Sequence, residues 1–173
     1  SETMKLKPAS VTDMLKKLEL KKTLHYQKYH GFELTEGGNR KALNIIRKHR
    51  LWEFFLVEKL GFHWDEVHAM AEELEHVTSE VLTSRLDAFL NFPAFDPHGD
   101  PIPDGKGRMK SIRQDHLGNL PLKKTLVVTA VKNQEASMLE LLNHYAIKIG
   151  TRLKILQRFP YDGSVEIKID KKP

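Results

Sequence analysis

The 173-residue chain is long enough for one substantial core or for several small domains, because a domain usually takes roughly 100 to 200 residues. It contains no Cys, which excludes disulfides and thiolate sites and fits a reducing cytosol, and no apolar run approaches the roughly 18 residues of a transmembrane helix. We therefore expect a cytoplasmic protein without a membrane partner. The net charge of +5 is uneven: residues 1–50 carry 12 Lys or Arg against 5 Asp or Glu, a net of +7, which is typical of a polyanion-binding segment.

The first predicted element is a helix over residues 8–20. Pro8 and the pair Ser10 and Asp13, three residues apart, are helix start signals. Apolar residues at spacings of three and four predict one buried stripe, formed by Val11, Met14, Leu15 and Leu18. The opposite face is small or polar at its start and is flanked by lysines, which favours a position in the major groove of DNA.

This opposite face supplies the candidate DNA contacts. We expect Ala9 and Thr12 to contact base edges and Ser10 to contact a phosphate. Lys7 and Lys16 are also expected at phosphates. A solvated, Lys-rich helix would give the same composition, so the interpretation depends on the element that follows.

That element is a short β-hairpin. Residues 24–28 and 32–34 alternate in hydropathy around Tyr29, His30 and Gly31, which predicts two strands with a basic and aromatic tip. A helix followed by such a hairpin is the second half of a winged helix. Because a helix-turn-helix also needs an earlier supporting helix, we expect that the N-terminal part of the winged helix is missing from this chain.

Helices and then a rigid loop fill the middle of the sequence. After Gly37 and Gly38 the periodicity predicts helices at about 40–59, ending at Gly61, and then at 64–77 and 79–90. Residues 92–105 are rich in Pro and Gly and exclude both helix and central strand. His98 and Asp100 in this loop are metal ligands by residue type, but we expect them to shape the loop instead.

The last third of the chain has a different pattern. A polar linker near 106–118 precedes a β-branched strand at 125–131 and an amphipathic helix at 134–145. Further strands are expected at 150–158 and 165–169, around a turn at Tyr161 to Gly163. This order resembles a small β-barrel with one inserted helix.

Side chains that can bind metal gather on two of the predicted helices. At about 100° per residue, one helix presents four of them within roughly a 100° arc: His68, Glu72, Glu75 and His76. His49 and Glu53, at i and i+4, share a face of the helix before it. Imidazole with carboxylate suits a divalent first-row cation, and six such ligands could hold two ions. Spacing alone fits a solvated acidic face equally well, and it leaves catalysis and sensing both open.

In combination, these features resemble the diphtheria-toxin-repressor family of metal-dependent transcription regulators, close to its manganese-transport-regulator branch. The resemblance covers essentially the whole chain and is carried by Lys7-Pro-Ala-Ser-Val-Thr-Asp-Met14, Leu34-Thr-Glu-Gly37, Arg47-Lys-His-Arg-Leu51, Val67-His68, Glu75-His76-Val77 and Pro97-His-Gly-Asp-Pro-Ile-Pro103. It implies a mainly α fold with small β parts: a partial winged helix-turn-helix (1–39), a helical metal-binding and dimerisation domain (40–105), a linker (106–119) and an SH3-like, FeoA-like β-barrel (120–173).

The resemblance also implies how the ligands divide. Glu72, Glu75 and His76 would belong to an activating site, which in the family takes a further ligand from a first helix that this chain cannot supply. An ancillary site would use His49, Glu53 and His68, completed by Glu135 from the SH3-like domain, while Met138 stands where the prototype has a second ligand. Iron-type members carry Cys at the position of Glu72, and a hard carboxylate shifts the preference toward Mn(II), so Mn(II) or Fe(II) is expected.

The leading hypothesis is a homodimeric repressor of manganese- or iron-uptake genes that binds palindromic double-stranded operator DNA when it is loaded with metal. The alternative is a dinuclear carboxylate-bridged metalloenzyme. Ferritin-like sites of that kind need Glu-x-x-His on two helices, and this chain has it once, at Glu73 to His76; the zincin pattern is missing. A third possibility is an SH3-like adaptor with an incidental metal, so we expect no enzyme but keep the alternatives open.

Overall fold

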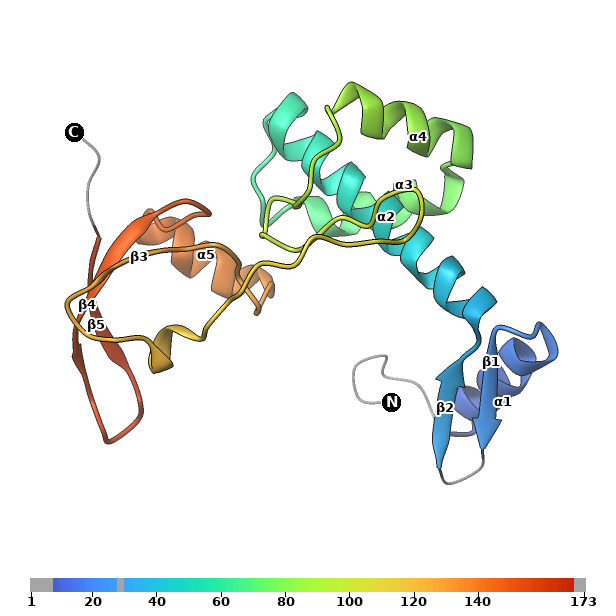
Figure 1. The fold of residues 1–173 in the computed structure, drawn as a ribbon, viewed down its shortest axis with the longest axis horizontal. Helices are drawn as coiled ribbons and strands as arrows, with labels where there is room; N and C mark the ends of the chain where they lie inside the picture. The colour runs from blue at the N-terminus through green and yellow to red at the C-terminus, as the bar shows by residue number, and fades with distance from the viewer. Residues whose placement is uncertain (1–7, 28–29, 170–173) are drawn as a thin grey trace.

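The computed structural model describes residues 8–27 and 30–169, and three groups of elements follow one another along it (Figure 1). The first group holds one helix and a hairpin, the second three helices and a long loop, and the third a small sheet with a helix. In chain order the elements are α1 (Pro8–Leu20), β1 (Leu24–Gln27), β2 (Gly31–Leu34), α2 (Glu36–Leu60), α3 (Val67–Val77), α4 (Glu80–Phe89), the 3-10 turn η1 (Leu117–Asn119), β3 (Thr125–Val127), α5 (Ala136–His144), β4 (Arg152–Arg158) and β5 (Val165–Ile169).

The N-terminal group confirms the predicted helix and hairpin. Strands β1 and β2 are antiparallel with Leu24 opposite Leu34, and Leu24 is buried. Met14 departs from the predicted stripe, because 41% of its surface remains exposed. Among the expected DNA contacts, Ser10 and Lys16 are exposed on α1 and Thr12 is half-buried. Lys7 lies outside the described residues, and the side chain of Ala9 is likewise outside the description.

Helix α2 begins four residues earlier than expected and runs for 25 residues. The Thr35 side chain caps it, because its hydroxyl accepts a hydrogen bond from the Gly38 amide at 2.9 Å and donates one to the Lys22 carbonyl at 2.8 Å. A Cβ on Gly38 would lie 1.8 Å from the Thr23 carbonyl oxygen, so the glycine permits close packing on the hairpin instead of breaking the helix. The predicted end at Gly61 is confirmed, with the left-handed φ of 74°.

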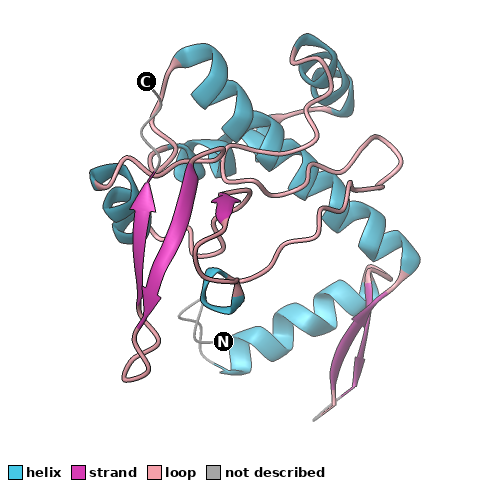
Figure 2. Ribbon diagram, turned by 60° about the vertical axis from the view of Figure 1, so that its left-hand side comes forward, coloured by secondary structure: helices cyan, strands magenta, loops and turns pink. Residues whose placement is uncertain are grey.

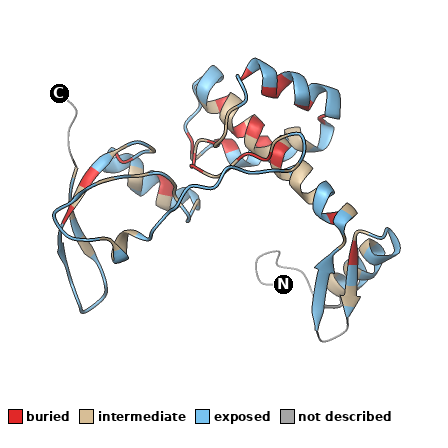
Figure 3. Cartoon of the chain, in the orientation of Figure 1, coloured by how far each residue is buried: buried red, intermediate tan, exposed pale blue. Residues whose placement is uncertain are grey.

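The central group contains the main core. Leu51 of α2, Leu86 and Leu90 of the α4 region, and Ile102 of the proline-rich loop form one buried cluster. Beside it, Arg47 and Asp87 form an ion pair at 2.6 Å, with only 8% and 10% of their side-chain surfaces exposed. Figure 3 shows this concentration of buried positions where α2, α3 and α4 meet. Within the described residues, no helix has the length and apolar character that a membrane crossing requires.

The C-terminal group is smaller than the closed barrel expected. Among the described residues, β3, β4 and β5 form one antiparallel three-stranded sheet in that order, with α5 beside it (Figure 2). The strand predicted at 125–131 ends at Val127; Val128 still bonds to Gly150 and Thr151, but the Val131 amide donates to the His98 carbonyl at 2.9 Å. The chain therefore leaves the sheet to reach the proline-rich loop, and the fold is mainly α with small antiparallel sheets.

The Arg47–Asp87 pair gives a test of the central core. Asp87→Asn leaves the buried guanidinium without its counter-charge, and we expect the free energy of unfolding to fall by about 3 to 5 kcal/mol. Asp115→Asn removes an exposed carboxylate that pairs with Arg113 and should cost less than about 1 kcal/mol. Urea unfolding at one protein concentration measures both. Equal losses in the two variants would show that the buried pair does not stabilise the core.

Candidate metal centre

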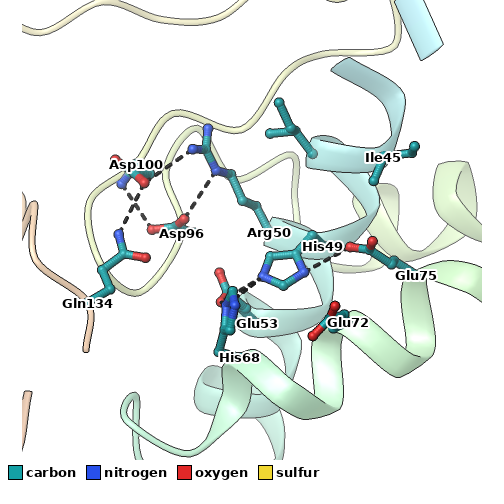
Figure 4. Close-up of a pocket in the computed structure, with 11 residues that line it drawn as sticks. Ile45, His49, Arg50, Glu53, His68, Glu72, Glu75, Asp96, Asp100 and Gln134 are labelled. Carbon is teal, nitrogen blue, oxygen red and sulfur yellow. Dashed lines mark hydrogen bonds and ion pairs between the residues drawn. The ribbon is translucent and has the colours of Figure 1, made fainter. Parts of the chain in front are cut away.

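A cavity of about 320 Å³ lies between α2, α3 and the proline-rich loop (Figure 4). Most of its polar lining is acidic or imidazole, and its apolar lining comes from two isoleucines of α2. The lining residues are Ile45, Ile46, His49, Arg50, Glu53, His68, Glu72, Glu75, Asp96, Asp100 and Gln134. The cavity therefore brings together five of the seven metal ligands expected from the sequence.

His49, Glu53 and His68 form the first metal-capable group. One turn of α2 separates His49 from Glu53, and their Nε2 and Oε1 atoms lie 3.0 Å apart. His68, in the first turn of α3, brings its Nδ1 to 3.1 Å from His49 Nε2 and 3.3 Å from Glu53 Oε1. These three atoms converge closely enough for a single cation to contact all of them.

Of the three residues expected at the activating site, two line the cavity and one does not. Glu75 reaches the other nitrogen of His49, with Oε2 at 2.9 Å from Nδ1, so His49 contacts members of both expected sites. Glu72 is exposed and lines the same cavity. His76 is exposed on α3 and does not line the cavity. The structure thus brings Glu72 and Glu75 to the cavity beside His49 and leaves His76 outside its lining.

A second metal-capable group was missed from the sequence. Glu53, Asp96 and His98 are all buried and bring ligand atoms within 4.8 Å of one another. His98 Nδ1 lies 3.7 Å from Glu53 Oε2 and 4.0 Å from Asp96 Oδ1, which are ion-pair distances that leave this nitrogen without a hydrogen-bond partner. We expected His98 only to shape the loop. The available signal was residue type, since an irregular loop has no periodicity from which to predict a shared face.

His98 has the orientation that a metal-binding histidine needs. Its Nε2 lies 2.8 Å from the Trp64 carbonyl oxygen and donates to it, so Nδ1 is the nitrogen that faces the two carboxylates. Metal-ligating histidines usually donate their second nitrogen in this way, which fixes the ring. Glu53 belongs to both groups, with Oε1 toward His49 and His68 and Oε2 toward His98.

The electrostatics of the groups follow from this sharing of Glu53. Burial alone would raise the pKa of Glu53, but its hydrogen bond to His49 and the attraction of His49 and His98 lower it to about 2. Burial opposes the charge on His49, yet Glu53 and Glu75 leave its pKa raised, and Glu53 similarly raises the pKa of the buried His98. Burial raises the pKa of Asp96 to about 6. Because carboxylates and imidazoles must be deprotonated to bind a metal, a cation that binds here would compete with the protons on these groups.

The C-terminal group contributes Gln134 to the cavity, and not the expected ligand Glu135. Glu135 is exposed at the N-terminal cap of α5 and does not line the cavity. Gln134 does line it, and its Nε2 donates to Asp100 Oδ2 at 3.1 Å. Arg50 binds the same carboxylate at 3.2 Å. Met138, considered at the position of a second ligand, is half-buried on α5.

The donor set fits a divalent first-row cation. Imidazole nitrogen and carboxylate oxygen are the ligands that Mn(II), Fe(II) and Zn(II) accept, and the buried His98 Nδ1 is directed at two carboxylates without a hydrogen bond of its own. Glutamate at position 72 adds a hard oxygen donor where a thiolate would favour softer ions.

Comparison with known proteins agrees with this chemistry. A family model described as "Iron dependent repressor, metal binding and dimerisation domain" matches residues 35–104. The iron-dependent repressor IdeR of Mycobacterium tuberculosis (strain ATCC 25618 / H37Rv) is 51% identical over 71 residues, which are 41% of this chain and 31% of that protein. A probable metal transport system membrane protein of Chlamydia trachomatis serovar D is 46% identical over 74 residues, 43% of this chain and 16% of that protein. The chain thus spans less than a third of the first curated relatives that it matches.

A solved structure extends the likeness to the whole chain. A manganese-dependent transcriptional repressor in complex with manganese has a TM-score of 0.88 and 34% identity, and the match covers 99% of this chain and 78% of that one. The fold is therefore one that the chain shares with metal-dependent transcription regulators. The chain belongs to the diphtheria-toxin-repressor family. The dinuclear-enzyme alternative finds no support in these relatives, none of which is named as an enzyme.

Glu53 provides the test of the shared centre. Glu53→Gln keeps the shape of the side chain but removes the charge that both groups share, and we expect Mn(II) affinity to fall by at least about tenfold. Glu58→Gln makes the same change on an exposed position of α2 outside the cavity and should bind as the unchanged protein does. Isothermal titration calorimetry with Mn(II) measures both. Unchanged affinity in Glu53→Gln would exclude this carboxylate as a shared ligand.

Proposed function

We propose that the protein is a metal-activated, DNA-binding repressor of metal-ion uptake genes, with Mn(II) or Fe(II) as its effector. The observation that carries this proposal is the cavity at which α2, α3 and the proline-rich loop bring carboxylates and imidazoles together. Family membership supports regulation rather than catalysis as the use of such a site. DNA as the target implies a cytoplasmic protein.

The proposed ligands form two neighbouring groups. His49, Glu53 and His68 hold one cation, and Asp96 and His98 extend this group from the buried side of Glu53. Glu72, Glu75 and His76 are proposed for the activating cation, with Glu135 a further candidate from the C-terminal group. A bound divalent ion supplies positive charge and coordination bonds between segments that are otherwise held by side-chain contacts alone. Because Glu72 offers oxygen, the set favours a hard ion such as Mn(II).

Helix α2 is the proposed route from the cavity to DNA. It carries His49 and Glu53 near its middle, and its first turn is fixed to the hairpin through Thr35 and Gly38. Ligation ties α2 to α3 and to the loop, so the ion favours one orientation of α2 and of the hairpin attached to it. An effector that binds one arrangement more tightly shifts the population toward that arrangement.

The proposed assembly is a homodimer on palindromic double-stranded DNA. Large apolar side chains remain exposed on and beside α4: Val77, Val81, Leu82, Phe89 and Phe92, with exposed fractions of 80%, 67%, 45%, 63% and 69%. These exposed apolar side chains, within the segment that matches a dimerisation model, support pairing of two copies there. Two copies would present two α1 helices, with Ser10, Thr12 and Lys16 among the contacts, to two half-sites.

We propose the same domain division as the sequence indicated. Residues 1–39 carry the winged-helix elements, 40–105 are the metal-binding and dimerisation domain, 106–119 the linker and 120–173 the SH3-like domain. The hairpin, the three-helix core and the three-stranded sheet support these units, and the first turn of α2 (Glu36–Leu60) crosses the boundary at residue 39. The exposed residues of the linker are consistent with a connecting segment.

DNA binding measured with and without the metal tests the proposal. A duplex is selected from random DNA by the Mn(II)-loaded full-length protein, and its affinity is then measured by fluorescence anisotropy with Mn(II) and with a chelator. We expect chelation to weaken binding by about tenfold or more, because typical effector couplings span roughly 5- to 150-fold. His49→Ala should reduce this metal response, whereas His63→Ala, which alters an exposed histidine outside the cavity, should retain it.

Two outcomes would contradict the proposed function. One is a selection that yields no duplex bound above background. The other is equal affinity for the selected duplex with Mn(II) and with chelator, which would leave the cation without an effector role.

A further inference from the structure

Trp64 lies between His98 and helix α5. Its ring stacks on the His98 ring with centroids 5.9 Å apart and an angle of 11° between the planes, and its carbonyl oxygen accepts the hydrogen bond from His98 Nε2. Its indole Nε1 donates to Asn143 Oδ1, in the last turn of α5, at 2.8 Å. Because only 8% of Trp64 is exposed, packing restricts its position. One buried residue therefore contacts both the metal-capable histidine and the C-terminal group.

The amide of Asn143 is engaged at both of its polar atoms. Oδ1 accepts from Trp64, and Nδ2 donates to Asp65 Oδ1 at 3.0 Å. The amide thus fastens α5 to the turn that connects α2 to α3. We call Trp64, Asp65 and Asn143 the α5 latch.

The C-terminal group also contacts the proline-rich loop directly. The Val131 amide donates to the His98 carbonyl at 2.9 Å. Gly99 has a φ of +88°, and a Cβ there would lie 2.0 Å from the Thr129 carbonyl oxygen, so the two segments are in close contact. His98 is consequently fixed through its ring by Trp64 and through its backbone by Val131.

This arrangement matters because the direction of His98 Nδ1 depends on Trp64. While Nε2 donates to the Trp64 carbonyl, Nδ1 faces Glu53 and Asp96. A shift of Trp64 would release Nε2 and let the ring turn away from the carboxylates. Partners that orient a ligating histidine typically change metal affinity when they are removed.

We propose that the α5 latch positions His98 and thereby couples docking of the C-terminal group to cation binding at Glu53, Asp96 and His98. The inference rests on the proposed cation site and adds a positioning role for residues outside it. By linkage the coupling is reciprocal: docking strengthens cation binding, and the cation strengthens docking by the same factor. Asn143 and Asp65 act only through Trp64, at a distance from the ligands themselves.

Zn(II) alone, added to the full chain, provides the first measurement. Asn143→Leu removes both hydrogen bonds of the latch, and we expect calorimetry to show unchanged stoichiometry with about fivefold weaker binding at one site. Asn119→Leu makes the same substitution at an exposed position in η1 and should bind as the unchanged protein does. Far-UV circular dichroism and urea unfolding confirm that each variant is folded.

A rescue experiment separates positioning from a general loss of packing. Asn143→Asp places a second carboxylate beside Asp65 and should weaken Zn(II) binding. Combining it with Asp65→Asn restores a donor and an acceptor between the two positions, and we expect affinity to recover toward that of the unchanged protein. A purely structural defect would instead accumulate in the double variant.

The reciprocal effect is read at Trp64 itself. The chain has two Trp residues, and Trp64→Phe assigns the indole N–H signal of Trp64 by nuclear magnetic resonance. Zn(II), which is diamagnetic, should slow solvent exchange of this N–H by about the same factor by which Asn143→Leu weakens binding.

Unchanged Zn(II) affinities in Asn143→Leu, unchanged indole exchange on adding Zn(II), or failure of the unchanged protein to bind Zn(II) would each overturn the inference. These readouts use no DNA. A protein with a working latch whose DNA binding ignores metal would refute the proposed repressor function alone.

Discussion

The buried carboxylate of Glu53 is the constraint on which the rest of the centre depends. Its two oxygens face different partners, Oε1 toward His49 and His68 and Oε2 toward His98. A charge with 3% of its side-chain surface exposed is costly unless it is compensated, and imidazoles from three separate segments supply that compensation. The packing of α2 against α3 and the loop is therefore inseparable from the balance of charge in the cavity.

The same helix that buries Glu53 also connects the N-terminal hairpin to the central core. Its N-terminal turn packs on the hairpin because Gly38 has no side chain, and its centre packs on the apolar cluster around Leu51. From Thr35 to His49 the helix extends about 21 Å, at 1.5 Å per residue. Since the intervening segment is continuous helix, a small tilt of α2 at the cavity moves the hairpin by a larger distance. This geometry suits a sensor, because a change in ligand contacts is amplified where the α1 helix lies.

Sequence reasoning recovered the helices within a few residues because amphipathic periodicity and the Gly61 cap are local signals. It misjudged Gly37 and Gly38 as a boundary, since their role depends on the distant Thr23 backbone. It extended the strand after Thr125 too far, because nothing local shows that Val131 pairs with the proline-rich loop. In the site, the i,i+4 spacing predicted that His49 and Glu53 share a helix face. His98 could be found only from the folded structure, because its partner Glu53 lies on another element and the irregular loop that carries His98 has no periodicity.

The distribution of ligands also explains why such a site responds to folding and docking. Two ligands one turn apart on a helix are present whenever the helix forms, but α3 and the loop must pack on α2 before the remaining atoms converge. A cation that contacts all of them binds only the assembled arrangement and stabilises it by mass action. The loop in turn is fixed by Val131 and, through Trp64, by Asn143, so assembly extends to the C-terminal group. The contacts that complete the cavity are therefore those that hold the parts of the chain together. Cation binding in the cavity and the packing of these parts are thus thermodynamically coupled.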